Sequence, residues 1–209
     1  MSFVAFDSGC VVANTKSRRK AFDKRLLLSA AAAALIASPA AQANPVGGVV
    51  TTGSASVSTS ANKTNVTQKS EDVVINWSSF NIGSGQTTQF YQPNAQAIAV
   101  NRVGGANASQ ILGTLDANGR VVLINGNGVL FGKGAQVNVG SLIATTTDGS
   151  DSDVLSGKFT QAGKQNASVI NDGAITAAGG GTVALVAPNV SNTGTVNAKL
   201  GTPPSIMPL

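Results

Sequence analysis

A repeat with a period of 21 residues constrains the fold of this chain more than any other feature. Five residues at alternate positions recur at this one offset: Val169, Asn171, Gly173, Ile175 and Ala177 match Val190, Asn192, Gly194, Val196 and Ala198. Alternate positions lie on one face of a β-strand, and a repeat of this length is typical of stacked architectures. We therefore predict that successive turns stack, with Ile175 over Val196 and an amide ladder between Asn171 and Asn192 at a corner.

The segment Asn118–Ile143 indicates how one turn is built. It contains three short apolar runs separated by Asn and Gly: Val121–Ile124, Val129–Phe131 and Val137–Val139. These runs are too short for helices, and Val and Ile favour strands. The pairs Asn118-Gly119 and Asn127-Gly128 tolerate positive φ, so they are expected to suit sharp corners. Three strands and three corners per turn predict an all-β parallel β-helix of roughly seven or eight turns.

Residues 1–43 have the features of a secretory leader. Six Lys and Arg residues precede an apolar run, Leu26–Ala37, that is too short to span a bilayer. Small residues at Ala41 and Ala43 suit signal peptidase, so we predict cleavage between Ala43 and Asn44, which N-terminal sequencing of the secreted protein will test. The segment Ser17–Phe22 resembles a twin-arginine signal, but its spacing is wrong and the Sec route is favoured.

The segment after this leader is close to neutral. It carries 8 Lys and Arg and 7 Asp and Glu, a net charge of +1, whereas the whole chain has +5. Nucleic acids and anionic membranes are bound by concentrated positive charge, so neither nucleic-acid binding nor stable membrane insertion is expected. The single cysteine, Cys10, lies in the leader. The remaining roughly 166 residues must therefore be held by an apolar core and backbone hydrogen bonds.

The N-terminal part of the mature chain is expected to close one end of the stack. Asn44–Ser60 is rich in Gly, Ser and Thr with alternating apolar positions. We predict that it forms a β cap over the open edge of the first turn. Val66–Trp77 continues as strand, and Trp77 and Phe80 are predicted to fill the core beside the cap.

Three segments depart from the strand pattern. Ala108–Leu115 has some helical or turn character, with Ser109 placed to cap one turn. Lys158–Gln165 is predicted to be a hairpin that leaves the β-helix and returns. Residues 202–209 contain three prolines, which cannot donate to a β-ladder. We therefore place the β-helical domain at residues 44–201 and an irregular tail at 202–209.

Catalytic and metal-binding chemistry is poorly represented. The chain has no histidine, which excludes Ser-His-Asp and Cys-His catalysis. Glu71 and Asp72 are adjacent and would point to opposite faces of a strand, a poor arrangement for an acid–base pair. Asp148, Asp151 and Asp153 would suit a calcium loop, but the spacing of an EF-hand is missing. We therefore expect no enzyme activity, no cofactor and no metal.

Five short motifs are more specific in combination than any one of them alone. They are Asn101-Arg102-Val103, Ser109–Gly113, Val122–Gly132, Val183–Val190 and Asn192-Thr193-Gly194. Together they closely resemble the filamentous hemagglutinin N-terminal domain, which is the secretion domain of two-partner secretion (TPS) exoproteins. The resemblance extends over nearly all of residues 44–201. It implies a right-handed parallel β-helix with a β cap and an extra-helical hairpin.

The resemblance also implies a function. Members of this family reach the periplasm unfolded, bind the periplasmic domains of a dedicated outer-membrane β-barrel transporter, and fold outside the cell. The chain is therefore expected to be secreted from a Gram-negative bacterium or displayed on its surface. Members are commonly adhesins, hemagglutinins or contact-dependent toxins, which makes a host-cell or surface receptor a further candidate partner.

Two family motifs that are candidates for transporter recognition are altered in this sequence. The usual Asn-Pro-Asn-Gly motif followed by Ile or Val is Asn125-Gly126-Asn127-Gly128-Val129, with Gly126 at the position of proline. The Asn-Pro-Asn-Leu motif has its counterpart at Gln92-Pro93-Asn94-Ala95. Loss of proline leaves φ free, which is expected to raise the entropic cost of ordering that corner.

The sequence leaves two other functions open. The domain would be a secreted adhesin or glycan-binding module in its own right, although Trp77 and Tyr91, its single Trp and Tyr, offer little surface for sugar stacking. A β-helical polysaccharide-active enzyme is the third hypothesis, and the missing histidine and carboxylate cluster argue against it. Because the family's secretion domain normally heads a longer fibre, we expect either a truncated product or a small stand-alone module.

Overall fold

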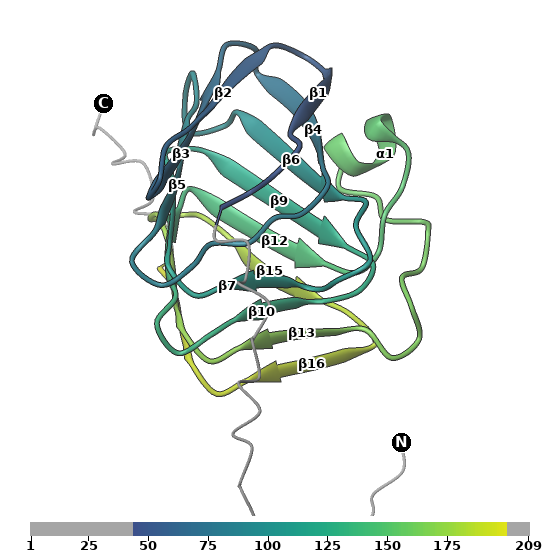
Figure 1. Ribbon diagram of the computed structural model, residues 1–209. Coiled ribbons are helices and arrows are strands. Elements are labelled where there is room, and N and C mark those ends of the chain that lie inside the picture. Colours follow the sequence, from purple (N-terminus) through teal and green to yellow (C-terminus); the bar gives the residue numbers. More distant parts are fainter. Residues whose placement is uncertain (1–43, 200–209) are drawn as a thin grey trace, which may run out of the picture. The chain divides into compact units, whose positions relative to one another are not determined.

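Three β-sheets run side by side along residues 44–199, the part of the chain that the computed structural model describes (Figure 1). The first sheet contains, in spatial order, β1 (Val49–Thr52), β4 (Asp72–Trp77), β6 (Ile98–Val103), β9 (Arg120–Asn125), β12 (Ser141–Thr145) and β15 (Val183–Val186). The second sheet contains β7 (Ser109–Ile111), β10 (Val129–Phe131), β13 (Ser168–Asn171) and β16 (Asn189–Asn192). The third sheet contains β2 (Ala55–Thr59), β3 (Lys63–Gln68), β5 (Thr87–Tyr91), β8 (Thr114–Ala117), β11 (Gln136–Val139), β14 (Ala174–Ala177) and β17 (Thr195–Ala198).

The chain winds through the third, first and second sheets in that order, and each strand pairs in parallel with the strand one turn earlier. The fold is therefore a parallel β-solenoid, as the sequence predicts, with about six turns marked by the six parallel strands of the third sheet. Registers in this sheet give successive turns of 24, 27, 22, 38 and 21 residues. The estimate of seven or eight turns is too high, because residues 44–62 do not form a turn and one turn carries a long excursion.

The 21-residue repeat is the register of the last two turns. Val169 pairs with Val190, and Ile175 pairs with Val196, so the predicted stacking is confirmed. The three apolar runs of Asn118–Ile143 are β9, β10 and β11, one strand in each sheet. The repeat length in the sequence thus corresponds to the number of residues in one of these turns, and the three apolar runs correspond to the three strands of a turn.

The prediction of helical or turn character for Ala108–Leu115 is wrong. This segment forms β7 and β8, with a break at Leu112-Gly113. Ser109 caps no helix, since it is a strand residue that pairs with Val129 and is only 1% exposed. Ile111 and Leu115 are fully buried in the core. Pairing with neighbouring turns therefore overrides the weak local preference of these residues.

The interior between the sheets is filled by one apolar cluster. Trp77 and Phe80 lie in it at 2% and 1% exposure, with their rings edge to face and 5.5 Å between centroids. The Trp77 Nε1–H donates to Asn101 Oδ1 at 3.0 Å, so its polar end is satisfied. These two residues fill the core of the first turn, as predicted.

The N-terminal cap is built from two antiparallel strands. β1 pairs antiparallel with β4, and β2 pairs antiparallel with β3, the first strands of the solenoid in their sheets. The predicted β cap is therefore confirmed, and it covers edges that would otherwise be unpaired. Within residues 44–199 no helix is long and apolar enough to cross a membrane.

The long turn contains an excursion between β12 and β13, whose residues 148–163 we call the strap. It includes α1 (Asp151–Leu155), the one helix of the described residues, and an antiparallel bridge between Asp148 and Gln161. The predicted hairpin at Lys158–Gln165 is thus only the returning half of a larger excursion. The outgoing half contains α1, and Val154 of this helix is buried against residues of β4, β6 and β9.

The last turn leaves inward-facing side chains exposed. Ile175 in β14 is fully buried, whereas its register partner Val196 in β17 is 39% exposed and Val190 in β16 is 50% exposed. No further strand covers this edge within the described residues.

This difference predicts unequal effects for alanine substitutions at the two paired positions Ile175 and Val196. Replacing Ile175 with Ala should lower the free energy of unfolding by about 2–5 kcal/mol, because a methyl-lined cavity forms in a packed core. Replacing Val196 with Ala should cost less than about 1 kcal/mol, since its side chain is already partly hydrated. Urea unfolding of both variants measures this, and equal losses would contradict the assigned open edge.

Candidate functional site

The two candidate recognition motifs lie at different corners of the solenoid. Gln92-Pro93-Asn94 connects β5 of the third sheet to β6 of the first sheet. Asn125–Val129 connects β9 of the first sheet to β10 of the second sheet, with Asn125 the last residue of β9 and Val129 the first of β10. The structure therefore does not bring them together into one site, and each has to be considered as a separate corner.

The Gln92 side chain links three successive turns through hydrogen bonds at the corner between β5 and β6. It is 7% exposed. Its Nε2 group donates to Gln68 Oε1 at 3.2 Å in the preceding turn, to Ala97 O at 2.9 Å, and to Arg120 O at 3.2 Å in the following turn. Its Oε1 atom accepts from the Gly119 N–H at 2.9 Å. Such an amide satisfies backbone groups that a sharp corner leaves unpaired.

The neighbouring residues of this motif extend the same network. The Gln92 N–H donates to Asn118 Oδ1 at 2.7 Å, and Asn118 Nδ2 donates back to Gln92 O at 2.8 Å. Asn94 Oδ1 accepts from the N–H groups of Gln96 and Ala97, which closes the corner locally. Pro93 and Ala95 are exposed, so these two residues of the motif face solvent.

Asn125 has the equivalent role at the other corner. It is fully buried, and its Nδ2 group donates to Asn107 O and to Ser109 Oγ, both at 3.0 Å, in the preceding turn. Its Oδ1 atom accepts from the Asn127 N–H at 2.9 Å, and Asn127 Nδ2 donates to Gly105 O at 2.7 Å. The polar side chains of this motif therefore form hydrogen bonds within the folded domain.

Residues 125–128 form a β-turn that would accept proline. The Gly128 N–H donates to Asn125 O at 2.9 Å, which makes Gly126 and Asn127 the two central residues. Neither has positive φ, as in a type I turn, for which Asn at the first position, Pro at the second and Gly at the fourth are favoured. A Cβ atom on Gly126 would meet nothing within 4 Å, and its N–H donates to no atom of residues 44–199.

The two Asn-Gly pairs need glycine for different physical reasons. Both pairs lie at corners, as expected: the first between β8 and β9, the second between β9 and β10. Gly128 has φ of +118°, which glycine tolerates, whereas Gly119 does not have positive φ. A Cβ atom on Gly119 would lie 2.8 Å from Gln92 Cδ and from Asn94 O. Glycine is needed at that position because another turn approaches closely, which a local pattern does not reveal.

The structure also brings Asn171 and Asn192 together. Asn171 is fully buried, and its Nδ2 group donates to Asn192 Oδ1 at 2.8 Å. Its own Oδ1 atom accepts from the Gly173 N–H at 3.2 Å. The pair has the geometry expected of a structural ladder.

The acidic segment forms ion pairs with an arginine. Arg102 Nε donates to both carboxylate oxygens of Asp148 at 3.0 and 2.8 Å, and Arg102 Nη1 donates to Asp151 Oδ1 at 2.8 Å. Asp153 instead accepts from Ser150 Oγ at the start of α1. The described residues contain no group of three or more Asp, Glu, Cys or His side chains placed to hold a metal ion. The calcium-loop hypothesis therefore has no geometric support.

Thr52 joins the same cluster from the cap. Its Oγ1–H donates to Asp151 Oδ2 at 2.7 Å. This hydrogen bond, together with that from Arg102, lowers the pKa of Asp151 below its ordinary value. Sequence reasoning missed this cluster, although an arginine within the apolar run Ile98–Val103 was a signal that an acidic partner exists elsewhere in the chain.

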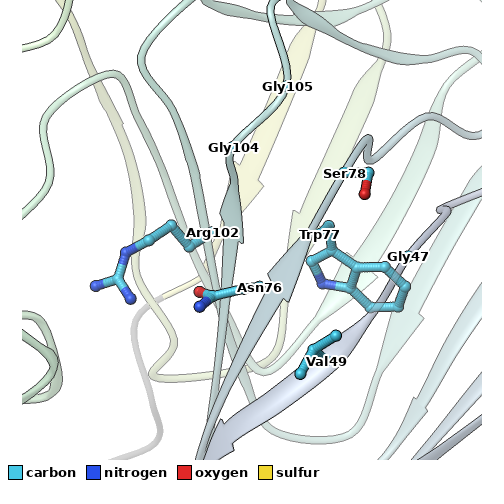
Figure 2. Close-up of a pocket in the computed structure, with 8 residues that line it drawn as sticks. All are labelled: Gly47, Val49, Asn76, Trp77, Ser78, Arg102, Gly104 and Gly105. Carbon is cyan, nitrogen blue, oxygen red and sulfur yellow. The ribbon is translucent and has the colours of Figure 1, made fainter.

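A cavity of about 540 Å³ lies beside this cluster, between β1 and the corner after β6. Its lining includes Val49, Asn76, Trp77 and Arg102 (Figure 2). Figure 2 shows Asn76 and Arg102 pointing to one side of the sheet and the Trp77 indole lying on the other. The guanidinium of Arg102 is already engaged by the strap, so the cavity offers no free cation and no acid–base pair within the described residues.

The predicted leader and tail lie outside the described residues. The cleavage site falls between Ala43 and Asn44, and only Asn44 belongs to residues 44–199. The boundary at residue 201 and the tail at 202–209 also fall outside. These assignments remain predictions.

Comparisons with known proteins agree with this architecture. A model of the TPS secretion domain matches residues 41–202. The chain is 50% identical over 104 residues to a heme/hemopexin-binding protein of Haemophilus influenzae strain Rd, a match that covers 50% of this chain and 12% of that protein. A second Haemophilus influenzae heme/hemopexin-binding protein is 51% identical over 90 residues, which covers 43% of this chain and 10% of that protein.

A solved structure extends the match to three dimensions. The crystal structure of the HMW1 secretion domain from Haemophilus influenzae superposes with a TM-score of 0.68 at 35% identity, covering 73% of this chain and 42% of that one. The fold and its corners thus define a β-solenoid secretion module. The chain belongs to the family of TPS secretion domains, and it is the secretion domain of a two-partner secretion exoprotein.

The corner at Asn125–Gly128 predicts the effect of restoring proline. Replacing Gly126 with Pro should raise the free energy of unfolding by about 0.4–1 kcal/mol, because it removes freedom from the unfolded chain and fits the folded turn. Urea unfolding measures this. Replacing Gly128 with Pro is the matched control and should destabilise, since φ there is +118°. A loss of stability in the first variant would contradict the assigned turn.

Proposed function

We propose that this domain is a transport signal. The periplasmic domains of a dedicated outer-membrane β-barrel transporter bind it while it is unfolded, and it folds after reaching the outside of a Gram-negative cell. Membership of the TPS family supports a transporter as the partner. A secreted or surface location follows from the same route.

One observation favours recognition before folding. In the folded solenoid, the polar side chains of both candidate motifs form hydrogen bonds with other parts of the chain. Gln92 is 7% exposed and Asn125 is 0% exposed. A partner that reads these amides would have to break several buried hydrogen bonds, each costing about 1–3 kcal/mol when left unpaired. An unfolded chain presents the same amides freely, so the unfolded state is the form in which Gln92, Asn125 and Asn127 can be recognised.

Folding outside the cell then makes export favourable. A transporter that binds only the unfolded chain holds it in an export-competent state, while burial of the core removes the folded product from that equilibrium. An extended segment is also the form that periplasmic domains can bind by adding a strand or by filling a groove.

The binding properties of the longer relatives are a separate matter. The matched segments cover 12% and 10% of the two heme/hemopexin-binding proteins. A receptor for the whole exoprotein, and an adhesive or glycan-binding role for this domain, have no specific support in the described residues. The transport role is therefore the function that the structure and the family favour best.

Secretion measured with matched variants tests the proposal. In cells that express the cognate transporter, Asn125→Ala should reduce release into the medium several-fold more than Asn171→Ala. Both asparagines are fully buried at corners, and each substitution should destabilise by about 1–3 kcal/mol, but only Asn125 belongs to a recognition motif. Gln92→Ala and Gln68→Ala form a second pair at one corner, since both side chains are buried and hydrogen-bonded to each other.

Two outcomes would contradict different parts of the proposal. Unchanged release from cells that lack the transporter would show that the domain is not a transport signal for that partner. Equal losses within each matched pair would show that the motifs act only through stability.

A further inference from the structure

Three strands of the first sheet, β4, β6 and β9, carry buried apolar residues on both faces. One set of alternate residues points into the core, and five residues of the other set form a second apolar cluster on the outer face. We call this set the outer strip; its members, none more than 8% exposed, are Val74, Ile98, Val100, Val122 and Ile124. Val74, Val100 and Val122 are register partners across three strands. A sheet of this kind must be covered on its second face.

The strap provides that cover. Val154 of α1 is 2% exposed within the same cluster, and Leu155 and Phe159 pack against it. Figure 1 shows α1 lying beside the first sheet, away from the solenoid interior. All strands that carry the outer strip precede the strap in the sequence, so burial of the strip depends on a segment that is added later.

Arg102 fastens the strap to this sheet. Beyond its bonds to Asp148 and Asp151, Arg102 Nη2 donates to Gly149 O at 3.1 Å, so one guanidinium binds three positions within four residues. Its side chain is 20% exposed. The hydrogen bond from Thr52 to Asp151 also joins the N-terminal cap to the strap, and these two residues are 99 positions apart in the sequence.

The strap is otherwise self-contained. Its remaining hydrogen bonds run between its own residues, including the α1 cap at Ser150 and the Asp148–Gln161 bridge. Within the described residues, every hydrogen bond between residues 148–163 and the rest of the chain involves Arg102 or Thr52. The strands β4, β6 and β9, by contrast, each pair with a neighbouring strand on both sides. A unit with internal bonds and few external ones can open without unfolding its neighbours.

We propose that the strap is a latch: it opens separately from the solenoid, is held shut by Arg102, and uncovers the outer strip when it opens. The apolar outer face of β4, β6 and β9 stays exposed until residues 148–163 dock. Docking then joins the cap, the first sheet and the strap through the hydrogen bonds of Thr52 and Arg102 to the strap. This inference does not rest on the proposed transport function.

Hydrogen exchange of the intact secreted chain tests the latch. The amides of Asp148, Val154, Ser156 and Gln161 should exchange as a group, about tenfold or more faster than the amides of β6, under conditions where the solenoid stays folded. Exchange of these amides at the rate of β6 would overturn the proposal, since the strap would then have no opening of its own.

A matched pair of variants tests the role of Arg102. Arg102→Met keeps a similar apolar stem but no donors, so strap exchange and tryptic cleavage after Lys158 should both accelerate about tenfold or more. Binding of a dye specific for apolar surfaces should also rise. Arg120→Met is the control, because Arg120 is exposed in the neighbouring strand β9 and forms no ion pair within the described residues.

The outcomes are distinguishable. Equal acceleration in both variants, or none in Arg102→Met, would overturn the role of Arg102. If Arg102→Met does not fold, Thr52→Val provides the test: it removes only the bond to Asp151, and a several-fold acceleration confined to the strap is expected. The absence of that acceleration would contradict the latch.

Discussion

In-register hydrogen bonding between successive turns is the constraint on which the rest of this structure depends. Every strand of the solenoid must arrive at the height of the strand one turn earlier, because its backbone groups have no other partners. The registers hold even when turn length varies from 21 to 38 residues. Extra residues are therefore expelled at corners, and the ladders themselves stay continuous.

The corners between the strands need additional hydrogen-bond partners, because the regular ladders end there. A sharp corner leaves N–H and C=O groups unpaired, and buried amide side chains satisfy them, with Gln92 and Asn125 each linking neighbouring turns. The same residues belong to the motifs proposed for transporter recognition. Under the proposed function, folding and recognition would compete for the same polar groups, which is physically consistent with a signal that is recognised before the chain folds.

The first sheet adds a second requirement. Its strands β4, β6 and β9 carry buried apolar residues on both faces, so a core inside the solenoid is not sufficient and the strap must cover the outer strip. The ion pairs of Arg102 hold this cover through one partly buried guanidinium, whose donors have fixed directions and reach Asp148, Asp151 and the Gly149 carbonyl together. Stability of the N-terminal turns is therefore linked to a segment far along the sequence.

The sequence by itself determined the parallel solenoid, the strands β9, β10 and β11, the stacking of Ile175 on Val196, and the capped first turn. These features follow from alternation and repeat length, which are local and periodic properties. Only the tertiary structure decided that residues 109–117 are strands, that Gly119 is required by close approach of Gln92, that the turns number about six, and that Asp148 and Asp151 pair with Arg102. Each of these depends on contacts between residues in different turns, and no local pattern in the sequence records which distant groups will meet.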